Sequence, residues 1–244
     1  MSATFPLLFV AGFVAGFINT VAGGGSVITL PILTEMLGAS VANGTNRVAI
    51  LIANVTAIAG FEKDKKVPWD RVRPLIPFML VGAGSGAWVA TQLSADAMKQ
   101  VFAVVLLIVA LSALFKPNLW LEQVEPKLSR TAASALFLVI GFYGGFVQAG
   151  VGFMLLAGLV MGSGLDLVRG SAAKVTLVAS YTWLALAIFI FAGQVDFGLG
   201  LILATGNASG AYLAARLAVR KGAPWVRWVL IVAALVAAVR LATS

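Results

Sequence analysis

Two long stretches of this chain, residues 1–34 and 131–165, contain no charged side chain. At about 1.5 Å per residue, the second stretch would be roughly 50 Å long as one helix, against a bilayer core of about 30 Å. Each stretch also contains a glycine cluster, at Gly23-Gly24-Gly25-Ser26 and at Gly150-Val151-Gly152. We therefore predict that each stretch forms a full helix followed by a short, glycine-led helix, at residues 27–37 and 153–161.

The rest of the chain is also suited to lipid. Hydrophobic residues make up 61% of it and charged residues 11%, whereas a soluble domain carries about 25% charged residues. Further apolar runs cover residues 48–60 (continuing one that starts near Asn43), 74–95, 100–115, 175–195, 197–215 and 225–241. The sequence predicts an all-α, polytopic integral membrane protein that crosses the inner (plasma) membrane several times, with the lipid bilayer as its surroundings.

The two halves of the chain, residues 1–118 and 119–244, resemble each other. We expect them to be two repeats within a single membrane domain. The glycine clusters are separated by 150 − 23 = 127 residues, and two basic residues match at the same offset, 174 − 47 = 127. The matching segments are Gly12–Phe17 with Gly141–Phe146, Gly23 with Gly150, Arg47 with Lys174, and Gly86–Ala90 with Gly210–Ala214.

The basic charge of the connectors changes sides between the repeats. Connector 62–73 holds five basic residues and its counterpart, 193–196, holds none, while 216–223 is basic and its counterpart, 92–97, is not. Because Lys and Arg favour the cytoplasmic side, matched connectors are predicted on opposite faces. This pattern predicts two inverted repeats of about five helical segments each, including one short glycine-led half-helix per repeat. The alternative is a parallel repeat with chance loop asymmetry.

Several function classes have no support in the sequence. The chain has no histidine and no cysteine, so we expect no disulfide and no metal site built on those residues. The apolar runs contain no paired carboxylates, and no P-loop or nucleophile-elbow motif is present. We therefore predict that the protein is not an enzyme and needs no cofactor. The net charge of +8 lies mostly in connectors rather than on one contiguous face, so we expect no nucleic-acid partner.

The glycine clusters are candidates for a binding site. A helix that opens at a glycine run leaves backbone N–H groups free at its positive dipole end, which suits an anion. The alternative is that these glycines only permit close packing or a kink. The candidate residues at the two clusters are Gly23, Gly24, Gly25, Ser26, Gly150 and Gly152.

Two cations and three amides complete the candidate set. Arg47 and Lys174 are each predicted to begin an otherwise apolar helix, where they would either face an anion or extend to the interface. The amides Asn19 and Gln148 precede the glycine clusters, and Asn46 precedes Arg47. Glu35 is the one candidate carboxylate within an apolar segment, so it is the possible coupling residue.

Pairs of glycines spaced four residues apart recur in both halves. They are Gly12 with Gly16, Gly82 with Gly86, Gly141 with Gly145, and Gly206 with Gly210. Such pairs let helices approach closely, and we predict that they pack helices within the bundle. A homo-oligomer remains a possible partner arrangement.

These motifs resemble those of the sulfite exporter TauE/SafE family of membrane permeases over nearly the whole chain. The segments that carry the resemblance are Gly12–Phe17, Gly23–Ser26, Leu30–Leu33, Asn43–Asn46 and Gly193–Phe197. The resemblance implies transport of sulfite, sulfonates or related sulfur-containing organic anions. The second glycine cluster is not a full triplet, so the two half-sites are not expected to be equivalent.

The sequence thus predicts a secondary transporter for a small anion that works by alternating access. The anion would lie between the glycine-led half-helices, near Arg47 and Lys174. The alternatives are an anion channel with the same cavity and a membrane accessory protein that transports nothing.

Overall fold

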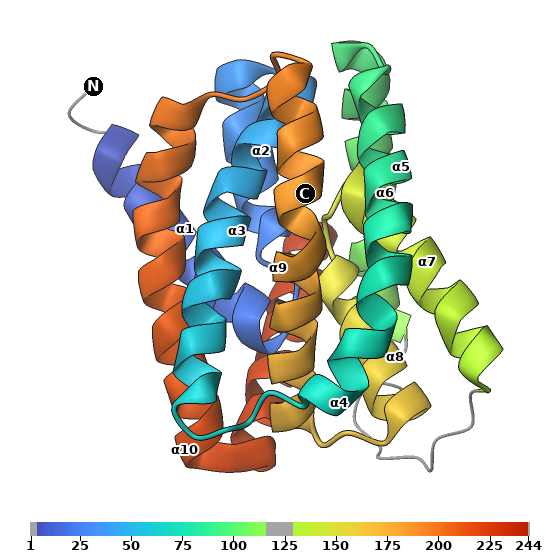
Figure 1. Ribbon diagram of the computed structural model, residues 1–244. Coiled ribbons are helices and arrows are strands. Elements are labelled where there is room, and N and C mark those ends of the chain that lie inside the picture. The colour runs from blue at the N-terminus through green and yellow to red at the C-terminus, as the bar shows by residue number, and fades with distance from the viewer. Residues whose placement is uncertain (1–3, 116–128, 244) are drawn as a thin grey trace.

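The computed structural model describes residues 4–115 and 129–243, and within these ranges it contains helices and no strands (Figure 1). The elements are α1 (Thr4–Val21), α2 (Ser26–Leu37), α3 (Ala39–Glu62), α4 (Trp69–Val72), the 3-10 turn η1 (Arg73–Leu75), α5 (Ile76–Thr91), α6 (Ala95–Phe115), α7 (Arg130–Phe146), α8 (Val151–Ser163), α9 (Leu167–Phe191) and α10 (Phe197–Thr243). Four of the described spans are long and apolar enough to cross a membrane. The prediction of an all-α membrane protein is confirmed.

Both predicted interruptions are present. Helix α1 ends at Val21 before α2 begins, and α7 ends at Phe146 before α8 begins. Helix α10 bends at Gly222, where φ is 75°, just before Pro224. When α4 to α5 count as one segment and α10 as two, each half supplies five segments. The expected repeat boundary at 118/119, and most of connector 116–130, lie outside the described residues.

Two glycine-lined contacts join the halves to each other. Helix α1 packs on α10, where a β-carbon added to Gly16 would lie 2.1 Å from the carbonyl oxygen of Asn207. Helix α7 packs on α5 in the same way, because a β-carbon on Gly86 would lie 2.0 Å from the Phe142 oxygen. The prediction that the glycine pairs pack helices within the bundle is confirmed, and each contact pairs a first-half helix with a second-half helix.

Helices α3 and α9 form the centre of the bundle and contact each other. They begin at Ala39 and Leu167, earlier than expected, so the prediction that Arg47 and Lys174 begin their helices is wrong. The polar and small residues before each cation are poor helix formers, but they are buried in tight contacts. A β-carbon on Gly44, for example, would lie 2.0 Å from the Gln194 oxygen. Tertiary packing therefore overrides their weak helix propensity.

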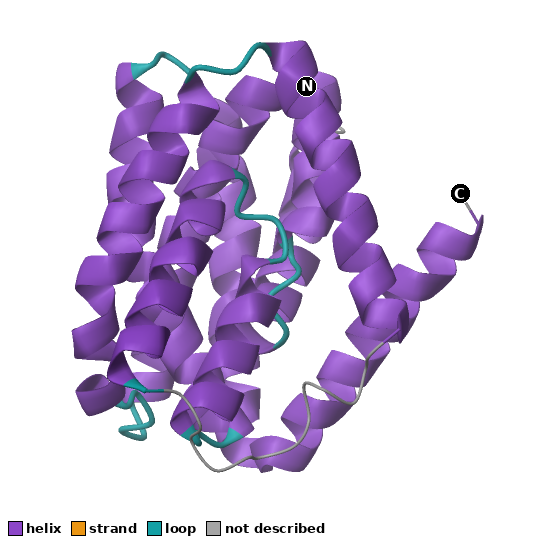
Figure 2. Ribbon diagram, turned by 90° about the vertical axis from the view of Figure 1, so that its right-hand side faces the viewer, coloured by secondary structure: helices purple, strands orange, loops and turns teal. Residues whose placement is uncertain are grey.

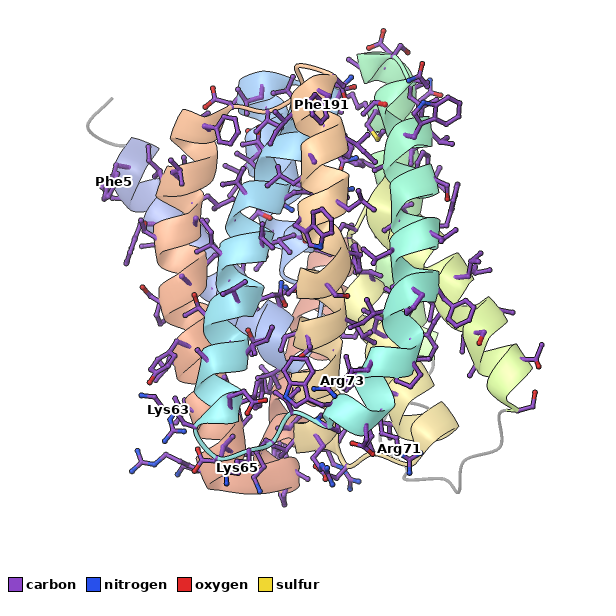
Figure 3. The ribbon with its side chains drawn as sticks, in the orientation of Figure 1. Phe5, Lys63, Lys65, Arg71, Arg73 and Phe191 are labelled. Carbon is purple, nitrogen blue, oxygen red and sulfur yellow. The ribbon has the colours of Figure 1, made fainter. Side chains whose placement is uncertain are left out.

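The two central helices run in opposite directions. Helix α3 ends next to Lys63 at the lower end of the molecule in Figure 3, whereas α9 ends with Phe191 at the upper end. The labelled basic residues Lys65, Arg71 and Arg73 also lie at the lower end. Arg216 of α10 joins them there through its ion pair with Asp64. One end of the bundle therefore carries much of the basic charge.

Candidate functional site

The two helix interruptions lie inside the bundle, away from both ends, where Figure 2 shows loop segments surrounded by helices. Three residues there adopt the left-handed backbone region: Gly23 with φ 99°, Gln148 with φ 66° and Gly150 with φ 71°. Glycine adopts this region without strain, which explains its use at both interruptions. All residues from Val21 to Ser26 and from Val147 to Gly152 are buried.

The interruptions contact each other through their backbones. A β-carbon placed on Gly23 would lie 2.4 Å from the Cα of Gly152, and one placed on Gly152 would lie 2.3 Å from the Cα of Gly23. Beside this contact, the ring of Phe153 covers Gly24, with 2.7 Å between its Cε2 and an added β-carbon. No side chain fits between the two segments at Gly23 and Gly152, so glycine is required there for steric reasons.

Both short helices begin with unpaired backbone donors. In the described part of the chain, the N–H groups of Gly24, Gly25 and Ser26 donate no hydrogen bond, and neither do those of Gly150 and Gly152. Neither N-cap residue has a side chain that satisfies these groups. The positive ends of the α2 and α8 dipoles thus lie in the centre of the bundle with these N–H groups unpaired.

A small polar cluster supports the start of α2. The Thr29 hydroxyl donates to Oδ1 of Asn46 at 2.8 Å, and Nδ2 of Asn46 donates to the Ser26 hydroxyl at 3.4 Å. All three side chains are buried. Asn46 lies on α3, so this cluster fixes the short helix α2 to the central helix.

Arg47 is fully buried and reaches from α3 to the end of α7. Its guanidinium donates to the carbonyl oxygens of Gly144, at 3.1 Å, and Gly145. It also donates to Oδ1 of Asn43 at 3.3 Å and stacks over the ring of Phe189 at 4.6 Å. The two glycines lie in the last turn of α7, so a cation from the first half caps the negative end of a second-half helix.

Lys174 makes the matching contact from the other half. Its side chain is 1% exposed, and Nζ donates to the carbonyl oxygens of Asn19 and Thr20, each at 2.8 Å. Those carbonyls belong to the last turn of α1. Neither cation extends to the membrane interface, because both are buried inside the bundle with their charges next to the interruptions.

The structure brings most of the predicted site residues together. The residues at or next to the two interruptions are Asn19, Gly23, Gly24, Gly25, Ser26, Asn46, Arg47, Gln148, Gly150, Gly152 and Lys174. Glu35 lies apart from them. It is exposed and nine residues beyond Ser26, which places it about 13 Å further along the α2 axis.

Sequence reasoning did not select several polar residues of the centre. Asn43 orients Arg47 and also donates to the Phe146 oxygen at 2.8 Å. Tyr181 and Thr182 on α9 are fully buried beside Gln148. Asn43 is four residues before Arg47, and Tyr181 is seven residues after Lys174, so helical spacing was the signal that could have identified them.

Comparisons with known proteins agree with this architecture. The model of the family described as sulfite exporter TauE/SafE matches residues 8–241. A probable membrane transporter protein, ORF9, of a Sinorhizobium species is 30% identical over 239 residues, covering 96% of this chain and 90% of that protein. The probable membrane transporter protein YfcA of Escherichia coli is 27% identical over 238 residues, covering 96% and 88%. No solved structure matches the chain significantly.

Proposed function

This chain belongs to the sulfite exporter TauE/SafE family of membrane transporters, and we propose that it is a secondary transporter that carries a small anion by alternating access. The proposed substrate is sulfite, a sulfonate or a related sulfur-containing organic anion, as the name of the family suggests. The proposed location is the plasma membrane, with several crossings.

One observation carries the choice of an anion: among the described residues, the centre holds two buried cations and no buried carboxylate. Arg47 and Lys174 are 0% and 1% exposed, and no Asp or Glu in the described ranges is buried or pairs with either. A charged group inside a membrane protein costs at least about 2.5 kcal/mol on insertion scales. Backbone carbonyls offset part of that cost through their dipoles but carry no net charge. A bound anion would neutralise the positive charge that the carbonyl dipoles leave uncompensated.

The ends of the short helices supply the second contribution. The unpaired N–H groups at the starts of α2 and α8 face the same central region as the cations. Interrupted helices of this kind, with their amino-terminal ends near the midplane, bind the anionic groups of substrates in secondary transporters. The proposed site therefore combines helix dipoles from both halves with one cation from each.

The contacts between the two halves support alternating access. The opposite directions of α3 and α9 support two inverted repeats, as does the basic charge gathered at one end, which we assign to the cytoplasm. Each cation holds the interrupted helix of the other half. A rocking movement of one repeat against the other would then change both caps together and expose the centre to each side in turn.

Counterflow in proteoliposomes tests this proposal. Vesicles containing purified protein are loaded with unlabelled sulfite, and uptake of labelled sulfite is followed. We expect internal sulfite to accelerate uptake. We also expect Arg47→Met and Lys174→Met to reduce uptake by roughly tenfold or more, because a hydrogen bond to a charged group contributes about 1.5–3 kcal/mol. The matched control is Lys99→Met, which changes an exposed lysine of α6 and should transport normally.

Each other outcome assigns a different function. Large anion conductance without acceleration by internal sulfite would identify a channel. Normal uptake by both Arg47→Met and Lys174→Met would reject the central site while leaving transport intact. Absence of flux for sulfite, sulfate, thiosulfate and organosulfonates alike would favour an accessory role.

A further inference from the structure

Three buried polar atoms near the end of α7 have no hydrogen-bond partner in the described part of the chain. They are Nε of Arg47, the hydroxyl of Tyr181 and Oε1 of Gln148. Their side chains are 0%, 0% and 3% exposed. An unpaired buried polar group costs about 1–3 kcal/mol, so three of them together need an explanation.

The Arg47 and Tyr181 side chains meet at Gly144. Arg47 donates to the Gly144 carbonyl oxygen at 3.1 Å. The Tyr181 hydroxyl lies 2.6 Å from the position that a β-carbon on Gly144 would occupy, with the Gln148 side chain beside it and the charge of Arg47 nearby. Because Gly144 has no side chain, the hydroxyl can lie directly against the α7 backbone.

The hydrogen bonds of Thr182 fix the orientation of the Gln148 amide. The Thr182 hydroxyl gives its single proton to the Val178 carbonyl oxygen at 2.6 Å, so towards Gln148 it can only accept. Gln148 must therefore present its NH₂ group to Thr182, at 3.2 Å. Its oxygen is left as an unpaired acceptor, on a side chain that lies beside Tyr181.

We propose that Arg47, Tyr181 and Gln148 form a subsite that selects an anion carrying its own hydrogen-bond donor. The inference rests on the proposed function and adds a chemical class to it. The two donors, Arg47 Nε–H and the Tyr181 hydroxyl, bind oxygens of the anionic head. Gln148 Oε1 accepts from a hydroxyl, ammonium or acidic proton of the same molecule. A fully deprotonated oxyanion without such a group leaves that oxygen unpaired and binds more weakly.

The tyrosine and the glutamine of the subsite have no chemical equivalents at the matching positions of the first half. Asn54, at the position 127 residues before Tyr181, donates to its own helix at the Ile50 oxygen. Val21, at the position 127 residues before Gln148, has an apolar side chain. The two interruptions therefore differ chemically. In this structure the three atoms are sealed from the surface, so binding requires the helix movement that alternating access supplies.

A pair of probes that differ in one hydroxyl tests the inference. Dissociation constants of ethanesulfonate and 2-hydroxyethanesulfonate are measured by calorimetry on the full chain in detergent. We expect the hydroxylated anion to bind the unaltered protein about tenfold more tightly, because a site that pairs a ligand hydroxyl disfavours the analogue without it. Gln148→Met should bring the ratio close to one. Tyr181→Phe should weaken both anions similarly and preserve the ratio.

Two further variants keep the test decisive if Gln148→Met fails to fold. Thr182→Val removes the acceptor that orients the amide, so it should reduce the ratio without touching the ligand. Tyr212→Phe changes a half-buried tyrosine whose hydroxyl accepts from Lys63, and it should leave both constants unaltered. A ratio near one in the unaltered protein, binding of neither probe, or an unchanged ratio in Gln148→Met and Thr182→Val overturns the subsite. If the subsite is overturned but sulfite counterflow persists, the proposed transport function still holds. Loss of all anion flux would overturn the transport function itself.

Discussion

Gly23 and Gly152, which come from different halves of the chain, lie in direct backbone contact at the centre of the bundle. A β-carbon on either one would lie within 2.4 Å of a backbone atom of the other. Each glycine belongs to an interruption between a full helix and a short one. The two interruptions therefore form one continuous region, and a change at one of them alters the other.

Gly152→Ala should block transport by separating the two interruptions. Gly152 does not have a positive φ, so the added methyl group acts only through its clash with Gly23, and overpacking of this kind costs about 1–3 kcal/mol. The control is Gly38→Ala, because Gly38 has φ 77° but nothing within 4 Å of its added β-carbon. We expect sulfite uptake to fall in Gly152→Ala and to persist in Gly38→Ala. Equal uptake by the two variants would contradict a functional contact between the interruptions.

Gly86→Ala should destabilise the contact between α5 and α7. The new methyl group would lie 2.0 Å from the Phe142 oxygen, so the two helices would have to separate. Gly84 on the same helix meets only Leu184 Cδ2, at 3.4 Å, and alanine there gains about 0.5–1 kcal/mol of helix stability. We expect thermal unfolding in detergent at a lower temperature for Gly86→Ala and at an equal or higher one for Gly84→Ala. The reverse order would mean that this glycine contact does not hold the halves together.

The positions of the helix interruptions could be predicted from the sequence, but the environment of the cations could not. A charge-free run too long for one crossing, with a glycine cluster inside it, leaves few alternatives to a broken helix. The contacts of Arg47 with Gly144 and Gly145 span about a hundred residues of chain, and no local pattern encodes them. The early start of α3 was missed because the chain before Arg47 has weak helix propensity and is stabilised by burial.

Lys174→Met should loosen the end of α1. The methionine leaves the carbonyl oxygens of Asn19 and Thr20 without their donor, at a cost of about 1–3 kcal/mol for each buried group. Hydrogen–deuterium exchange should therefore increase in residues 18–25, whereas Lys174→Arg should keep most of the protection by donating to the same carbonyls. Lys99→Met serves as the exposed control. Unchanged exchange in Lys174→Met would show that Lys174 does not cap this helix.

Single cysteines can test the orientation of the repeats, because the natural chain contains no cysteine that would react in their place. Lys65 and Gly193 are both exposed loop residues with positive φ, at opposite ends of the molecule, next to the ends of α3 and α9 respectively. If the basic end is cytoplasmic, a membrane-impermeant maleimide added to intact cells should label Gly193→Cys. Lys65→Cys should react only after the membrane is permeabilised. Labelling of both variants in intact cells would place the two matched connectors on the same face of the membrane. That result would contradict the inverted repeat, even though α3 and α9 run in opposite directions.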